Sequence, residues 1–489
     1  MASFVCGNPC YLCSCSNSSI QVNPRIYKRE VTSYYLSGKT TVVFEELYQE
    51  DKQLAVHADL SDEDQQISFP EIGTQAIDSE TGEHMANADE KVKLIDTIQY
   101  KGLVPNLKYT ATGTLMDAKT GEPVLINDKQ VTAKTTFTPE TSSGTVDVVF
   151  EFDGSSLAGK TTVVFESVTQ DKKEIAVHAD LEDGDQQIFF PEIATQANCP
   201  DTNTQMAVPK KELTITDTVS YHLIPNKEYK LTGTLMDKES GEPLQIDGKE
   251  VTSELTFTPE DAEDTVELTF TLDATALAGK TIVAFESVSY QDKEVAFHTQ
   301  IDDAPQTIYF PEIKTTAKDG KDGDQEVLAE KETSIIDTVS YKDLVTGLTY
   351  RVVGTLMDKE TGKEVLIDGK PVTSEATFKP ENSEGTVEVT FTFDATSLSG
   401  HDVVVFEKLY VSTGDKDNKK EVELTNHEDI NDNDQTVKIT DVPKDTPDIS
   451  TPVKTGDDTP LLLYAGIAAG ALLLAGIATV IYFRKKKQK

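Results

Sequence analysis

Five polar side chains recur in a fixed order along the chain: a Thr, an Asp, a Glu, a His and a Gln. A Thr hydroxyl is a weak nucleophile at neutral pH unless a base such as neutral His accepts its proton. The carbon of a Gln amide is a poor electrophile, so a donor must stabilise the charge that develops on its oxygen. Asp and Glu held close together share one proton, and the protonated member can donate. The sets are Thr74, Asp96, Glu166, His178, Gln186; Thr195, Asp217, Glu286, His298, Gln306; and Thr315, Asp337, Glu407, His427, Gln435.

The spacing within these sets is regular. His and Gln are eight residues apart in all three, and again in an incomplete set, His57 and Gln65. Glu and His are twelve residues apart in the first two sets and twenty apart in the third, where 412–420 lengthen the intervening hairpin. Taken singly, such side chains usually cap turns or lie in solvated loops. Four of the seven His residues at one position of a repeat favour a reaction of each unit with itself.

The polar sets belong to a repeat of about 120 residues. Val-Val-Phe-Glu or a near variant ends at four Glu residues, Asp-Thr-x-x-Tyr occurs three times, and Gly-Thr-Leu-Met-Asp begins at Gly113, Gly233 and Gly354. Before Thr74, only the back half of a unit is present, so we expect the chain to begin inside a repeat. The predicted parts are a Cys-containing, unstructured leader (1–32), a partial repeat (33–70), three complete repeats (71–191, 192–311, 312–440), a spacer (441–460), a transmembrane helix (461–483) and a basic tail (484–489).

Each unit is typical of β-structure. Runs that alternate apolar and polar residues, or that are rich in β-branched and aromatic residues, are separated by turn pairs such as Asp247-Gly248. About eight short strands per unit favour an all-β fold of tandem immunoglobulin-like β-sandwiches. In the second repeat the expected strands are 251–258, 265–272, 281–288 and 294–298.

Composition excludes several classes of protein. The chain has 489 residues and a formal net charge of −40, which argues against nucleic-acid binding because phosphates require a basic surface. With 37% hydrophobic residues, the chain has enough apolar side chains for several cores, which argues against general disorder. Five Cys residues are too few for a disulfide scaffold of this length.

The C-terminal region combines three elements in a specific order. Residues 461–483 carry no charge and are long enough to cross a bilayer, and the basic tail at 484–489 places the preceding chain outside the cell. Just before the span, Thr455-Gly456 ends a short polar motif, and the whole arrangement resembles the cell-wall sorting signal of Gram-positive surface proteins. The resemblance implies cleavage between Thr455 and Gly456 by a sortase. Pro452 and Val453 stand where that family has Leu and Pro, and a permanent single-pass anchor is the alternative.

The N-terminal region does not fit an exported protein. Residues 1–19 have no basic segment followed by an apolar run, so we expect a truncated or wrongly assigned start. Cys6, Cys10, Cys13 and Cys15 allow a zinc cluster as an alternative to an unstructured leader. Their spacing lacks two Cys-x2-Cys units across a longer loop, so no metal site is predicted.

The recurring motifs resemble the VaFE repeats of Gram-positive surface adhesins over Ser33 to about Thr440. In that family the Thr hydroxyl attacks the Gln carboxamide and ammonia leaves, with help from a His and two acidic side chains. The resemblance implies ester bonds in each complete repeat, without a cofactor. Alignment with Thr74 favours Thr315 over Thr316, and the eight-residue spacing from His178 favours Gln186 over Gln187. The implied pairs are Thr74 with Gln186, Thr195 with Gln306, and Thr315 with Gln435.

An ester of this kind joins the first strand of a repeat to its last, and Gln186 and Thr195 of consecutive pairs are nine residues apart. We therefore predict a cell-surface stalk of an adhesin or pilin-like protein, not a turnover enzyme. Its expected partners are a sortase, peptidoglycan or a pilus subunit, and a host or matrix ligand held by missing upstream domains. A hydrolase site, ligand-binding adhesin domains, and calcium binding at 319–324 or 429–434 are the alternatives.

Overall fold

The computed structural model describes residues 36–413 and 420–443. The chain divides into two units, Met1–Thr440 and Asp441–Lys489. Four predicted features lie outside the described residues: the leader with Cys6 to Cys15, the sorting motif at Thr455 and Gly456, the membrane span at 461–483 and the basic tail. Within the described ranges, no helix is long and apolar enough to cross a membrane.

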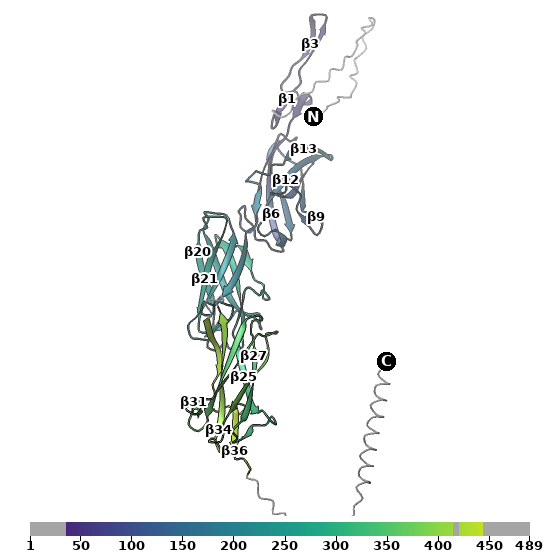
Figure 1. Ribbon diagram of the computed structural model, residues 1–489. Helices are drawn as coiled ribbons and strands as arrows, with labels where there is room; N and C mark the ends of the chain where they lie inside the picture. The colour runs from purple at the N-terminus through teal and green to yellow at the C-terminus, as the bar shows by residue number, and fades with distance from the viewer. Residues whose placement is uncertain (1–35, 414–419, 444–489) are drawn as a thin grey trace, which may run out of the picture. The chain divides into compact units, whose positions relative to one another are not determined.

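The first complete repeat consists of two packed sheets, and the prediction of an all-β fold is confirmed (Figure 1). One sheet has three strands in the order β11-β6-β5, and the other has five, β10-β7-β12-β13 with β14 also paired to β12. The two sheets contain eight strands, in line with the expected number of about eight, and β8 and β9 form a separate two-stranded pair. The bounds are β5 (Glu71–Asp78), β6 (Val92–Lys101), β7 (Tyr109–Asp117), β8 (Leu125–Ile126), β9 (Lys129–Gln130), β10 (Thr132–Phe137), β11 (Ser143–Phe152), the 3-10 helix η3 (Ser155–Leu157), β12 (Thr161–Gln170), β13 (Lys173–His178) and β14 (Gln187–Phe189).

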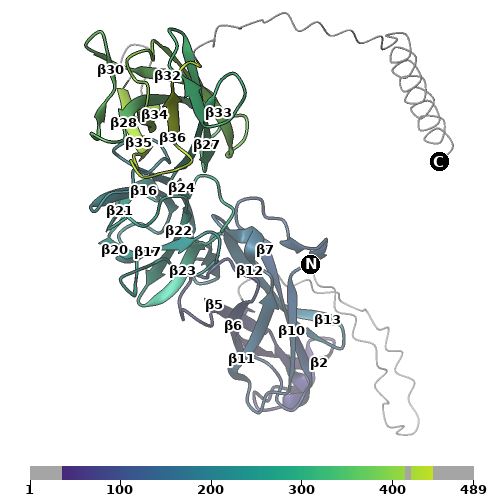
Figure 2. The same ribbon diagram turned by 90° about the horizontal axis from the view of Figure 1, so that it is seen from below.

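The second complete repeat has the same two sheets, in the orders β15-β16-β21 and β20-β17-β22-β23, with β24 paired to β22 (Figure 2). All four strands expected in this repeat are present, with small shifts at their ends. The bounds are β15 (Glu192–Asn198), β16 (Leu213–His222), β17 (Tyr229–Asp237), β18 (Gln245–Ile246), β19 (Lys249–Glu250), β20 (Thr252–Phe257), β21 (Glu263–Leu272), β22 (Thr281–Tyr290), β23 (Lys293–His298) and β24 (Thr307–Tyr309).

The third complete repeat adds an edge strand. Its β26 pairs in parallel with β36, which extends the larger sheet. The bounds are β25 (Glu312–Asp319), β26 (Glu326–Leu328), β27 (Thr333–Lys342), β28 (Thr349–Asp358), β29 (Lys363–Glu364), β30 (Leu366–Ile367), β31 (Lys370–Pro371), β32 (Thr373–Phe378), β33 (Gly385–Phe393), β34 (Asp402–Thr413), β35 (Lys420–His427) and β36 (Thr436–Thr440).

The partial repeat has two separate strand pairs and no described facing sheet. Phe44, Leu47, Tyr48 and Val56 are each about half exposed, although their counterparts in complete repeats belong to a sandwich. The elements are β1 (Thr40–Val42) paired with β4 (Gln66–Ser68), β2 (Glu45–Gln49) paired with β3 (Lys52–His57), and the 3-10 helix η2 (Glu63–Gln65).

Each complete repeat has its own apolar core, made by alternate residues of facing strands. The Gly of Gly-Thr-Leu-Met-Asp is required by this packing. A Cβ at Gly233 would lie 2.6 Å from the ring of Phe270, which belongs to the opposite sheet. Gly113 and Gly354 are in the same relation to Phe150 and Phe391. The motif that marks the repeat in the sequence is therefore a packing requirement beside the site described next.

Candidate crosslinking site

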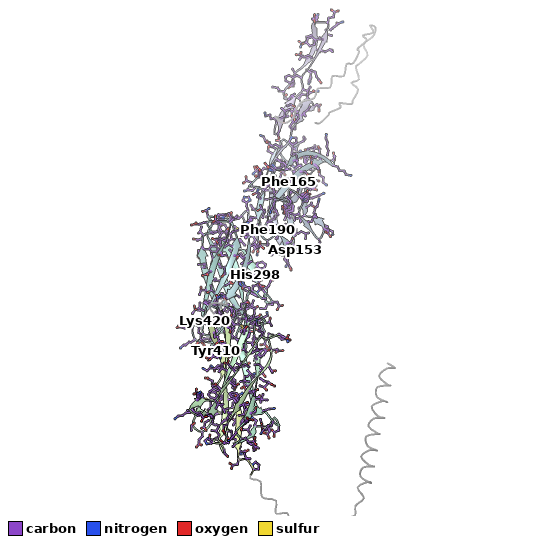
Figure 3. The ribbon with its side chains drawn as sticks, in the orientation of Figure 1. Asp153, Phe165, Phe190, His298, Tyr410 and Lys420 are labelled. Carbon is purple, nitrogen blue, oxygen red and sulfur yellow. The ribbon has the colours of Figure 1, made fainter. Side chains whose placement is uncertain are left out.

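The two sheets of each repeat carry different parts of the polar set. In the second repeat, Thr195 lies on β15 and Asp217 on β16, and these adjacent strands pair Ala197 with Asp217. Glu286 lies on β22, and its cross-strand partner on β23 is His298, labelled in Figure 3. Because β15 contacts β23 and β24, the Thr and Asp of one sheet face the Glu of the other.

The Gln residue is fixed through its own backbone. Its carbonyl oxygen accepts a hydrogen bond from the strand that carries Glu, at 3.1 Å from Ala284 N to Gln306 O in the second repeat. The residue before it accepts from the strand that carries Thr, at 3.0 Å from Ala197 N to Pro305 O. The first and third repeats repeat both bonds. The Gln is therefore held between the two strands whose side chains it must meet. The equivalent bonds are Val164 N to Gln186 O (3.2 Å), Ala76 N to Asp185 O (2.9 Å), Val405 N to Gln435 O (3.2 Å) and Ala317 N to Asp434 O (2.9 Å).

Side-chain hydrogen bonds join Thr to Glu in the second and third repeats and Gln to Asp in the first and third. Thr74 Oγ1 and Gln306 Nε2 have no hydrogen-bond partner among the described residues. Thr195 Oγ1 donates to Glu286 Oε2 at 3.1 Å. In the third repeat, Thr315 Oγ1 donates to Glu407 Oε2 at 3.1 Å, and Gln435 Nε2 donates to Asp337 Oδ1 at 3.4 Å. The first repeat has the second of these bonds, from Gln186 Nε2 to Asp96 Oδ1 at 3.3 Å.

The structure distinguishes the residues that the sequence left side by side. Thr315 is 5% exposed and contacts Glu407, whereas Thr316 points to the other face of β25 because side chains alternate along a strand. Gln186 is fully buried and contacts Asp96, whereas Gln187 Nε2 donates to the backbone oxygen of Leu181. Of these neighbours, Thr315 and Gln186 are therefore the ones whose side chains lie in the buried site.

The site is buried and incompletely paired. The Asp and Gln side chains are 0% exposed and the Glu side chains at most 1%. Gln186 Oε1, Gln306 Oε1 and Gln435 Oε1 each lack a hydrogen-bond partner among the described residues, as does one oxygen or more of each Asp and Glu in the sets. An unsatisfied buried polar group costs about 1–3 kcal/mol, so these groups are not there for the stability of the unreacted fold.

Burial keeps a proton in this site. Burial is the largest cause that raises the pKa of each Glu, and the negative charge of the neighbouring Asp is the next. Burial also raises the pKa of each Asp, but hydrogen bonds partly offset that rise. The proton therefore resides mainly on Glu, and the pair carries one negative charge rather than two.

Each His is oriented by an Asp that the sequence analysis did not single out. His178 Nε2 lies 2.7 Å from Asp183 Oδ2, and the same contact joins His298 to Asp303 and His427 to Asp432. The partial repeat has it too, between His57 and Asp62 at 2.5 Å. A constant spacing of five residues after His was the available signal. The His is therefore hydrogen-bonded to Asp, and the group in direct contact with the Thr hydroxyl is Glu.

The partial repeat holds only part of the set. Its Glu45 and His57 are cross-strand partners, as in the complete repeats, but Glu45 is exposed. Among the described residues before Gln65 there is no Thr strand or Asp strand to complete the site. Gln65 therefore occupies the position of the reacting Gln, but the described residues place no Thr strand beside it.

The acidic loops form local turns. Asp319, Asp322 and Asp324 bring carboxylate oxygens within 4.8 Å of one another, and Asp319 Oδ1 accepts a hydrogen bond from Lys321 N. In the loop at 429–434, Asp429 and Asp432 accept from backbone N–H groups two residues on. Such turns are the usual conformation of exposed Asp-rich loops.

Comparison with solved structures finds distant likenesses. A bacterial adhesin from Mobiluncus mulieris containing intramolecular disulfide, isopeptide and ester bond cross-links is 16% identical, with 51% of this chain and 88% of that chain covered and a TM-score of 0.21. The C-terminal domain of the Streptococcus agalactiae AgI/II polypeptide BspA is 10% identical, with 48% and 98% covered and a TM-score of 0.24. No curated protein matches the chain.

Comparison with family models gives a match over most of the chain. The model of the T-Q ester bond containing domain matches four times, at residues 16–69, 70–190, 191–310 and 311–439. The first match covers the partial repeat, and the other three cover the complete ones. The chain thus belongs to the family of T-Q ester bond containing domains, as its motifs predicted.

Proposed function

We propose that each complete repeat joins its Thr to its Gln once, by an ester bond, and that the series of repeats serves as a crosslinked stalk. The observation that carries this proposal is the contact of Thr315 with Glu407 and of Gln435 with Asp337 in the buried site of the third repeat. A turnover enzyme would need access for a substrate, whereas the Asp, Glu and Gln side chains of each set are at most 1% exposed. The nucleophile and the electrophile are both supplied by the domain.

The proposed reaction uses the two hydrogen bonds as proton paths. Thr Oγ1 attacks the Gln side-chain carbonyl carbon and passes its proton to the Glu oxygen to which it is hydrogen-bonded, while Glu passes the proton that it already holds to the ionised Asp. Asp then gives that proton to Gln Nε2 as the C–N bond breaks. One C–O bond forms, one C–N bond breaks, ammonia leaves, and the pair ends with the one proton it began with.

The His–Asp contact supports the same step from the rim of the site. His298 is about one-fifth exposed and neighbours Glu286 across β22 and β23. Its ring is hydrogen-bonded to Asp303, whereas the Thr195 hydroxyl contacts Glu286. That His is the base stays a prediction, and the direct contact favours Glu.

The ester would change how the repeat carries load. Thr195 lies on the first strand of its repeat and Gln306 directly before the last, β24, so the bond links the points where the chain enters and leaves. Nine residues then lead from Gln306 to Thr315. Tension would pass along covalent bonds and short linkers rather than through the hydrogen bonds of the sheets.

The place of such a stalk is the surface of a Gram-positive bacterium. The proposal rests on the resemblance of 452–489 to a sorting signal. A sortase would cleave between Thr455 and Gly456 and join the Thr carbonyl to peptidoglycan or a pilus subunit, with the apolar segment holding the chain in the membrane beforehand. Immunoglobulin-like repeats would then hold a domain that binds a host or matrix ligand away from the cell.

Peptide mapping tests the proposed ester in a single repeat. After denaturation and digestion of the full chain, we expect the peptide with Thr315 to be covalently linked to the peptide with Gln435, with a combined mass lower by one ammonia, about 17 Da. Thr315→Val should give two separate peptides. Thr316→Val is the matched control and should keep the link, because Thr316 faces away from Glu407. Separate peptides in the unaltered chain would disprove the proposal.

A further inference from the structure

Consecutive repeats share a methionine that belongs to one repeat and is buried in the core of the next. Met85 is 1% exposed and packs in the core of the second complete repeat, while Ala86 packs in the core of the first. Met206 is 0% exposed and packs in the core of the third repeat, while Ala207 packs in that of the second. Successive side chains of an extended segment point to opposite sides, so one short segment serves two cores.

Polar and aromatic contacts surround the first of these joints. Met85 forms a parallel bridge with Phe189, whose ring meets His222 of the next repeat edge-on at 5.0 Å. The hydroxyl of Tyr229, also in the next repeat, lies 3.8 Å from the Met85 sulfur. Asn87 Nδ2 donates to Glu294 Oε1 at 3.3 Å. The joint is therefore more than the contact of one side chain.

The second joint has the same plan. Met206 forms a parallel bridge with Tyr309, and Tyr309 and Val208 pack against the core of the third repeat. Lys342 Nζ of the third repeat donates to the backbone oxygen of Gly279 in the second at 3.0 Å. Burial is the largest cause that raises the pKa of Tyr309, in agreement with its place in the joint.

The third repeat has charged residues at the corresponding positions. Glu326 follows Thr315 by eleven residues, as Met85 follows Thr74 and Met206 follows Thr195. Lys438 follows Gln435 by three residues, as Phe189 follows Gln186 and Tyr309 follows Gln306. Glu326 and Lys438 are partners in the parallel pair of β26 and β36, and both are exposed. Val327, next to Glu326, packs in the core of its own repeat.

We propose that the segments with Met85 in the first repeat and Met206 in the second are docking segments for a following domain of the same type, and that Glu326 and Lys438 end the series in the third. The surface that receives the docking segment is the start of β17 and the loop before it, around Tyr229, or the equivalent part of β28, around Tyr350. The partner that fits is a second copy of this domain, not an unrelated protein. A repeat with the charged pair has no apolar side chain to offer at this end, because a buried charge without a partner is costly.

Oxidation by hydrogen peroxide, followed by peptide mass spectrometry of the full chain, tests this proposal. Met116 and Met357 are partly exposed strand residues and serve as internal standards. We expect Met85 and Met206 to be oxidised at least about tenfold more slowly than these standards, because a buried thioether reacts only after local opening. Equal or faster oxidation would overturn the docked joint, since an undocked methionine would lie at the exposed end of its repeat.

Three variants copied from the chain itself test the specificity of each joint. Phe189→Lys reproduces Lys438 in the first joint and should accelerate oxidation of Met85 without affecting Met206. Tyr309→Lys should do the reverse. In Glu326→Met, the new thioether should be oxidised at least as fast as Met116, since the described residues place no further repeat against this position. Unchanged rates in the two Lys variants, or slow oxidation in Glu326→Met, would overturn the proposal.

Discussion

Replacement of Thr195 by Val removes one ester and should lower the stability of one repeat by a calculable amount. Val has nearly the shape of Thr but no hydroxyl, so the bond to Gln306 cannot form. Thr195 and Gln306 are 111 positions apart. In the chain-entropy account of crosslinks, closing a loop of about 100 residues is worth about 4.7 kcal/mol at 25 °C. The expected loss is therefore about 4.7 kcal/mol in the second repeat and little in the others.

Native-state hydrogen exchange measured by mass spectrometry can read this loss repeat by repeat. At about 1.4 kcal/mol per factor of ten, the core amides of β16 and β21 should exchange more than about a thousandfold faster in Thr195→Val. Those of β6 and β11 should change little. Thr195→Ser is the control, because it keeps a hydroxyl and the ester. A loss of at most about 1.5 kcal/mol, the contribution of one hydrogen bond, would refute the reasoning.

Four further experiments have expected outcomes. Glu286→Gln should leave Thr195 and Gln306 unlinked in peptide maps, because the amide cannot accept the Thr proton, whereas the first and third repeats stay linked. In Thr195→Val, the stability of the unlinked second repeat should fall as pH rises above 4.5, the ordinary pKa of Glu, by up to about 1.4 kcal/mol per pH unit. Stability falls with pH because burial and Asp217 raise the pKa of Glu286, so the folded state keeps a proton that the unfolded state releases. Adding Glu286→Gln should flatten the dependence of stability on pH, measured by urea denaturation, between pH 5 and 8. Gly233→Ala should destabilise the second repeat by about 1–3 kcal/mol in hydrogen exchange, because its Cβ would meet the ring of Phe270, and equal stability would contradict the packing argument. Gln65 should be found unlinked by peptide mapping, and a Thr peptide attached to it would contradict the account of the partial repeat.

The all-β fold could be predicted from the sequence, and the candidate site residues could be selected, because both the strand patterns and the polar residues repeat. The period gives each complete unit an equivalent of Thr195, Asp217, Glu286, His298 and Gln306, and alternation along β20 to β23 identifies the strands. The same alternation explains why Thr315 rather than Thr316 faces Glu407. Repetition thus supplied information that one domain alone would not contain.

The hydrogen bonds within the site could not be predicted from the sequence, because they depend on the positions of individual side-chain atoms. The sequence analysis expected the Thr hydroxyl to meet His, whereas the contact is with Glu, and His is bonded to an Asp five residues later. The fixed His–Asp spacing was visible but resembled an ordinary acidic loop. The joints were missed for another reason. Met85 and Met206 are apolar residues in turn-rich segments, and their partners belong to a different repeat.

The intact mass of the purified full chain tests the central claim most directly. Each ester releases one ammonia, so three esters lower the mass by about 51 Da from that calculated for the sequence. The account predicts this deficit, and a deficit smaller by about 17 Da in each of Thr74→Val, Thr195→Val and Thr315→Val. A chain at its full calculated mass would contradict it.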